Sequence, residues 1–144
     1  MQDLKTNMKI KVEDLINIQL DWAVAKCQNI KVSVRFCKKE NEPYKYVWFQ
    51  TQEYSPSTND LVWEIYSPSK TWAQAGPIIE QEKITFDYDF YGQSLSLWTA
   101  RKYAFDGTLL WAESGDSPLI AAMRCFVASR LDDEVEIPEE LIET

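Results

Sequence analysis

The sequence predicts an α+β fold, in which a mainly antiparallel sheet of about five or six strands is covered by two or three helices, in the manner of an α-β-α sandwich. Several short segments rich in β-branched and aromatic residues follow one another, separated by polar or Gly/Pro-bearing connections. Strands joined by short connections pair antiparallel. Two further segments place apolar residues at helical spacing, and 144 residues suffice for one hydrophobic core.

The N-terminal part is predicted to form a strand, a helix and a second strand. Residues 8–12 alternate apolar and basic side chains, as a short half-buried strand does. The helix that follows ends near Asn29, because apolar residues recur at helical spacing, namely Ile16, Leu20, Ala23, Val24 and Cys27. Residues 30–36 then alternate apolar and polar side chains, which predicts a strand with one solvent-facing side.

The middle of the chain is predicted to supply most of the sheet. Five segments there combine β-branched and aromatic residues and are bounded by turn-forming residues. They are residues 44–50, 61–66, 84–90, 95–105 and 108–112. Most connections between them are short, which favours antiparallel pairing of neighbours.

The clearest helix in the sequence begins at Pro118. Ser117 is a favoured N-cap residue, and proline is favoured in the first helical turn. One apolar stripe follows at helical spacing, formed by Leu119, Ala122, Met123, Phe126, Val127 and Leu131. We expect this helix to pack on the sheet.

The chain divides into a leader of residues 1–7, a single α+β domain of residues 8–131 and an acidic C-terminal segment of residues 132–144. The last segment carries seven acidic residues and no basic one, which predicts a solvated terminus. Its apolar residues are expected to dock one corner of it onto the domain; these are Val135, Ile137, Leu141 and Ile142.

The net charge of −8 bounds the possible partners, and the acid excess lies in the second half of the chain. Such a charge repels phosphate backbones, and no Lys/Arg stripe interleaved with aromatics offsets it, so we expect no direct nucleic-acid binding. The sequence has no apolar run of signal-peptide or membrane-span length. Its three widely spaced cysteines fit a reducing compartment, so we expect a cytoplasmic protein without membrane association.

The stretch from Tyr66 to Ile79, YSPSKTWAQAGPII, is the most informative local motif. Thr71 and Gln74 match a capping box, in which Thr71 Oγ1 accepts a hydrogen bond from the Gln74 backbone N–H and the Gln74 side chain reaches back. A helix should therefore begin here. Gly76 and Pro77 predict that this helix is short and interrupted.

The same stretch is the candidate ligand site. A helix start offers free backbone N–H groups beside hydroxyls and an aromatic ring, which suits a phosphate-bearing ligand with a flat base. The candidate ligand-binding residues are Tyr66, Ser67, Ser69, Lys70, Thr71, Trp72, Gln74, Gly76 and Arg124. Two structural explanations compete with this hypothesis: helix capping accounts for the hydroxyls, and extension of a side chain to solvent accounts for Arg124.

Catalytic residue combinations are mostly absent from the sequence. The chain has no His, which removes the usual general base near neutral pH and the commonest metal ligand. Ser67 and Lys70 fit the S-x-x-K pattern, but they lie in a turn-forming region rather than on a helix. Two carboxylate pairs are better explained as solvated than as metal or acid–base sites: Asp87 with Asp89, and Glu80 with Glu82. We expect no enzyme, metal or cofactor.

Three blocks of the sequence resemble the phage NinX-like family, a family of unknown function, in the family's order. They are LDWAVAKC (20–27), YSPSKTWAQAGPIIEQEKI (66–84) and SPLIAAMRCFVASRLDDEVEIPEEL (117–141). The resemblance spans Met8 to Leu141. The chain has Lys70, Thr71 and Ala75 where the family's STDWAQGGP has Thr, Asp and Gly, which removes one carboxylate acceptor. The order of elements is also similar to that of phage α-β-α sandwich domains.

The resemblance implies a phage accessory protein that acts on host defence or metabolism. The leading hypothesis is a non-catalytic protein that binds and sequesters a nucleotide-type small molecule, such as a host defence signal, with Tyr66 or Trp72 stacking the base. The alternative is an acidic protein–protein inhibitor, in the extreme a DNA mimic, of a host protein. The aromatic residues in excess of a small core are consistent with a homodimer.

Overall fold

The structure is a computed structural model that describes residues 7–39, 42–91 and 95–142. In chain order the elements are β1 (Asn7–Lys11), the 3₁₀ helix η1 (Val12–Asp14), α1 (Asn17–Cys27), β2 (Val32–Lys39), β3 (Glu42–Tyr54), β4 (Leu61–Ile65), α2 (Trp72–Glu82), β5 (Thr85–Tyr91), β6 (Leu95–Tyr103), β7 (Leu109–Gly115), α3 (Pro118–Leu131), β8 (Glu134–Pro138) and the 3₁₀ helix η2 (Glu139–Leu141). The α+β class is confirmed, with slightly more strands than predicted. Residues 1–6 of the predicted leader and 143–144 of the acidic segment lie outside the described residues.

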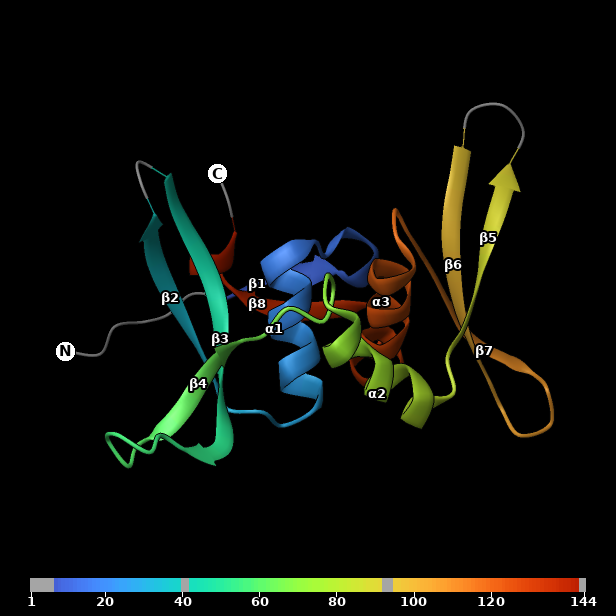
Figure 1. Ribbon diagram of the computed structural model, residues 1–144. Helices are drawn as coiled ribbons and strands as arrows, with labels where there is room; N and C mark the ends of the chain where they lie inside the picture. The colour runs from blue at the N-terminus through green and yellow to red at the C-terminus, as the bar shows by residue number, and fades with distance from the viewer. Residues whose placement is uncertain (1–6, 40–41, 92–94, 143–144) are drawn as a thin grey trace.

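The described strands form three antiparallel sheets rather than one. Their orders are β2-β3-β4, β5-β6-β7 and β1-β8. Figure 1 shows the two three-stranded sheets on opposite sides of the three helices. The prediction of a single sheet was wrong because α2 separates β4 from β5, so that strands consecutive in sequence lie on different sides of the molecule.

The short sheet joins the two ends of the described chain. Strands β1 and β8 pair antiparallel, with Met8 opposite Ile137 and Ile10 opposite Val135. Both β8 residues are buried, and so is Leu141 in η2. The predicted docking of these apolar residues is confirmed. The acidic residues among 134–141 are exposed, as expected for a solvated terminus, but their alternation with Val135 and Ile137 forms a half-buried strand that was not predicted.

Helix α3 is the centre of the core. Its N-cap is confirmed, since Ser117 Oγ accepts a hydrogen bond from the Ile120 N–H at 3.2 Å. The predicted apolar stripe is wider than expected, because eight residues around the helix are buried: Leu119, Ala121, Ala122, Met123, Cys125, Phe126, Val127 and Ala128. A helix that is apolar on nearly all sides is one that the protein surrounds.

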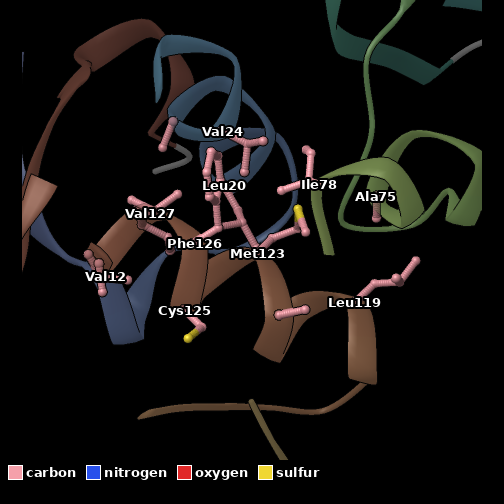
Figure 2. Packing of buried hydrophobic residues seen from close by; sticks show 14 of the residues in the cluster. Val12, Leu20, Val24, Ala75, Ile78, Leu119, Met123, Cys125, Phe126 and Val127 are labelled. Atoms are coloured by element: carbon pink, nitrogen blue, oxygen red, sulfur yellow. The ribbon is translucent and has the colours of Figure 1, made fainter. Parts of the chain in front are cut away.

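The other two helices pack against α3. Figure 2 shows Leu20 and Val24 of α1 directed toward Phe126, and Ile78 of α2 directed toward Met123. All five side chains are buried in one cluster. Within the described part of the chain, none of the helices is long and apolar enough to cross a membrane.

Helix α2 passes through Gly76 and Pro77 without interruption. The prediction of a broken helix was wrong. Pro77 has no N–H, so the helix lacks the hydrogen bond to the carbonyl of Ala73. Ala73 and Pro77 both lie on the exposed side of α2, where water can bond to that carbonyl. Burial of Ala75 and Ile78 on the opposite side holds the helix together.

The junction between β7 and α3 gives a test of the fold. A Cβ added at Gly115 would lie 2.7 Å from Ile120 Cγ2 and 2.8 Å from the Ala121 backbone nitrogen. We predict that Gly115→Ala lowers the free energy of unfolding by about 1–3 kcal/mol. In α2 a Cβ at Gly76 would meet nothing within 4 Å. Gly76→Ala should therefore raise the free energy of unfolding by about 0.5–1 kcal/mol.

Urea denaturation of the two variants and the wild type measures both effects. Equal effects of the two substitutions, or a stabilising Gly115→Ala, would contradict the close approach of α3 to β7.

Candidate functional site

The first half of the predicted ligand stretch faces the interior of the protein. Tyr66 is only 5% exposed, and its ring makes an edge-to-face contact with Phe49, with 5.2 Å between ring centres. Ser69 is also buried. The Tyr66 ring is therefore covered by the protein and not presented for stacking by a nucleotide base.

The buried partner of this turn is Asp21 of α1. Its Oδ1 accepts a hydrogen bond of 2.8 Å from the Ser69 backbone N–H, and the residue is 4% exposed. Burial raises the pKa of Asp21 to about 6, against the opposing effects of the Ser69 hydrogen bond and the Lys70 charge. Sequence reasoning misses Asp21; the available signal was a carboxylate within the otherwise apolar run of residues 20–25.

Two hydroxyl groups lie in the same buried region. Tyr66 Oη and Ser69 Oγ have no hydrogen-bond partner among the described residues. Burial and the nearby Asp21 raise the pKa of the Tyr66 hydroxyl well above its ordinary value, so it stays protonated. The hydrogen bond from the Ser69 N–H to Asp21 therefore attaches the turn to α1. Burial of the Asp21 carboxyl and of the two hydroxyl groups costs folding free energy.

The second half of the stretch is held by Gln74. Its Oε1 accepts from the Ser67 backbone N–H at 2.7 Å, and its Nε2 donates to the Ile65 carbonyl at 2.9 Å. Thr71 is the N-cap of α2, as predicted, but its hydroxyl lies 2.9 Å from Ser67 Oγ and makes no cap hydrogen bond. The predicted capping box was wrong, because the long Gln74 side chain satisfies the backbone at the end of β4 instead.

Outside the turn, Trp72 begins a row of aromatic rings. Its ring lies 6.1 Å from that of Phe86, which lies 6.1 Å from Trp98, which in turn lies 5.2 Å from Tyr88. Trp72 is 54% exposed, and Tyr88 is exposed to a similar extent. We call these four residues of α2, β5 and β6 the aromatic row. Of the predicted site residues, Lys70 is exposed next to Trp72, whereas Gly76 lies farther along the helix.

Arg124 has a structural role, whereas the sequence predicted either ligand binding or extension of its side chain to solvent. Its Nε donates to the Leu15 carbonyl at 3.0 Å, and its Nη1 donates to the Ser114 carbonyl at 2.7 Å. The side chain therefore attaches α3 to the loop after η1 and to β7. These carbonyls hold its guanidinium, and neither of them belongs to the Tyr66–Gln74 turn, so Arg124 is not brought together with the other predicted site residues.

Carboxylates from three elements gather beside Arg124. Two adjoining hollows share Glu13 and Glu113, and we call them together the acidic cleft. The acidic residues that line it are Glu13 of η1, Glu113 of β7, Asp116 after β7, Asp133 before β8 and Glu134 of β8; Lys11 and Arg124 are the basic ones. The hydrogen bond from the Val12 N–H to the Asp133 carbonyl, 2.8 Å long, holds two of its walls together.

In the free protein, the acidic cleft disfavours the charged form of Glu113. Burial raises the pKa of Glu113, the nearby Glu13 and Asp133 raise it further, and Arg124 opposes this only in part. Among the described residues, no group of three or more His, Cys, Asp or Glu side chains is arranged to hold a metal ion. The acid excess of the second half was visible in the sequence, but the participation of Glu13 was not.

The carboxylates considered for catalysis are mostly ion-paired. Arg101 contacts Asp87 at 3.4 Å and Asp89 at 3.2 Å across the β5–β6 pair. Glu82 contacts Lys102 at 2.8 Å and Arg130 at 2.9 Å. These pairs connect neighbouring elements, which favours the structural explanation over an acid–base site.

Asp21 gives a test of this geometry through pH. Its pKa is about 6 in the fold and close to 3.8 when unfolded, so the folded state binds more protons between these values. The stability contributed by protonation is complete below pH 3.8 and is lost as the pH rises through 6. We predict that the free energy of unfolding falls by about 1–2 kcal/mol between pH 5 and pH 8 through this group alone.

Asp21→Asn keeps an oxygen acceptor for the Ser69 N–H and removes the charge, so it should abolish that part of the pH dependence and stabilise the protein at pH 8. Asp21→Ala removes the acceptor and should destabilise the protein at both pH values. Urea titrations at pH 5 and pH 8 measure these effects. Loss of stability at pH 8 in Asp21→Asn would show that the charge itself holds the turn.

Comparison with known proteins places the chain in a family. A search of curated proteins finds no match to it. A family model described as "Bacteriophage P22, NinX" matches residues 11–130, which include α1, the Tyr66–Gln74 turn, the aromatic row and most of α3. The match covers most of the sequence and agrees with the resemblance carried by its three blocks. The chain therefore belongs to the NinX family of bacteriophage proteins.

Proposed function

We propose that this phage protein is a non-catalytic binding protein that acts in the host cytoplasm by occupying a basic surface of a host protein with its acidic cleft. One observation carries the proposal: Glu13, Glu113 and Asp133 come from separate parts of the chain and converge on one cleft. A partner that supplies Lys or Arg side chains would offset the repulsion that Glu13 and Asp133 exert on Glu113.

The free protein does not neutralise this cleft by itself. Five acidic residues line the cleft against two basic ones, and the charge of Arg124 only partly offsets the shift in the pKa of Glu113. Like charges held close together cost free energy in the unbound state. A positively charged partner removes this cost on binding, which increases both the affinity and the association rate.

The aromatic row supports a protein partner. Exposed Trp and Tyr side chains are enriched at the energetic centres of protein–protein interfaces. Trp72 and Tyr88 are each about half exposed, and the rings of Phe86 and Trp98 support them from below. The protein therefore exposes aromatic side chains as well as the acidic cleft, and binding through them needs no catalytic group.

Sequestration of a nucleotide-type ligand stays a second proposal, and the exposed ring of Trp72 beside the start of α2 favours it. The acidic cleft is unsuited to such a ligand because its carboxylates repel phosphate. Protein purified from cells that make nucleotide defence signals should release nucleotide on heat denaturation, and Trp72→Ala should release none. An empty supernatant from the wild type would remove this proposal.

The protein-binding proposal predicts a salt-sensitive complex in pull-downs from host lysate. A cleft variant carries Glu13→Gln, Glu113→Gln and Asp133→Asn. A matched control removes three charges elsewhere, with Asp60→Asn, Glu64→Gln and Glu80→Gln. We expect the cleft variant to bind the captured host protein about tenfold or more weakly, because each lost charge pair costs on the order of 1 kcal/mol, and the control to bind normally.

Calorimetric titration of the purified host protein measures the three affinities. Equal weakening by the two variants would mean that only net charge matters. Binding that persists unchanged at high salt would contradict an electrostatic complex.

A further inference from the structure

The turn between β6 and β7 carries an apolar surface that the proposed function does not use. Phe105 is 110% exposed, which is more than in an extended peptide. Three neighbouring apolar side chains, Tyr103, Leu109 and Leu110, are each about half exposed. We call these four residues the apolar tip.

The exposure of Phe105 is fixed by a well-bonded turn. The Ala104 N–H donates to the Thr108 carbonyl at 2.7 Å, and the Gly107 N–H donates to the Ala104 carbonyl at 2.9 Å. Gly107 has a φ of 91°, a conformation that favours glycine, and the Thr108 N–H donates to Asp106 Oδ1 at 2.9 Å. The chain therefore holds Phe105 outward at a defined position.

A β-bulge enlarges the apolar tip. Lys102 pairs with Trp111 and Tyr103 pairs with Leu109, so Leu110 is an extra residue in β7. Leu109 thus pairs with Tyr103, Leu110 follows it, and all three side chains stay exposed at this end of the hairpin. Several exposed apolar side chains at one end of a hairpin on a small protein are a candidate interaction site.

Strand β7 connects the apolar tip to the acidic cleft. The strand begins at Leu109, and its residues Ala112, Glu113 and Ser114 line the cleft. Four residues of extended chain separate Leu109 from Glu113, which is about 13 Å at the usual rise per residue. A protein that covers the cleft therefore reaches the tip as well.

We infer that the apolar tip is the hydrophobic anchor of the complex: Phe105 inserts into an apolar pocket that basic side chains border on the host protein. This inference rests on the proposed function and names the chemistry of the partner's surface. The apolar tip and the acidic cleft both lie along strand β7. The partner therefore needs an apolar pocket next to a Lys/Arg cluster.

Charge and size argue against two other occupants. A second copy of the chain would place one acidic cleft close to another, and four side chains are far fewer than the ~20–30 residues a side of a stable interface. An anionic membrane surface would repel Asp106 and the nearby acidic cleft. A basic protein surface is attracted to the same carboxylates.

The test places a photoreactive benzophenone amino acid at position 105 of the full chain, with Thr58, which is exposed in the β3–β4 loop, as the control position. After irradiation in host lysate, we expect one host protein to cross-link from position 105 and not from position 58. The cross-linked peptide of that protein should line an apolar pocket with Lys or Arg at its edge.

A second measurement uses Phe105→Ser, which should leave the unfolding midpoint unchanged because the side chain packs against nothing. It should weaken binding to the cross-linked host protein about tenfold or more without changing the salt dependence. The cleft variant, in contrast, should reduce the salt dependence.

Three results would overturn the inference: cross-links from position 105 to a second copy of the chain, binding of the chain to vesicles of phosphatidylethanolamine and phosphatidylglycerol that Phe105→Ser abolishes, or unchanged affinity of Phe105→Ser. If the cleft variant still loses affinity while Phe105→Ser does not, the proposed function stands and the anchor fails. If no host protein binds the wild type, both fail.

Discussion

The burial of α3 on nearly all sides is the constraint on which the rest of the structure depends. Ala121, Ala122 and Ala128 give this helix small side chains where other elements approach, and Phe126 and Met123 fill the space between it and α1 and α2. A helix enclosed in this way needs partners on every side. The chain provides them with α1, α2, the β5-β6-β7 sheet and strand β8, whereas the β2-β3-β4 sheet lies on the other side of α1 (Figure 1).

The same helix positions the candidate binding surface. Arg124 of α3 donates to the carbonyls of Leu15 and Ser114, so it holds the loop after η1 and strand β7 at fixed positions. Glu13 and Glu113 lie on these two segments and face one cleft. The Arg124 guanidinium keeps its positive charge while it makes these bonds, and that charge offsets the shift in the pKa of Glu113 only in part. The charge of the cleft remains available to a partner, and the hairpin that carries Glu113 ends in exposed apolar side chains.

The sequence predicted what local patterns encode. The Ser117 cap, the start of α2 after Thr71 and the strands follow from nearest neighbours and periodicity, and all are present. The division into three sheets and the pairing of β1 with β8 depend on contacts between distant segments. For the same reason the site was only partly predictable. The turn that contains buried Tyr66 is bonded through Ser69 to Asp21, forty-eight positions earlier than Ser69, and no spacing within the Tyr66–Gln74 turn reveals that bond.

The central claim is that burial, Glu13 and Asp133 disfavour the charged form of Glu113 in the free protein, and the pKa of Glu113 tests it most directly. Carbon-detected NMR titration of the side-chain carboxyl should give a pKa above the ordinary value of a glutamate, because of burial and the charges of Glu13 and Asp133. Neutralising those two residues should bring the pKa back toward that value. A pKa of Glu113 at or below the ordinary value in the wild type would contradict the account, because the cleft would then already be neutralised from within.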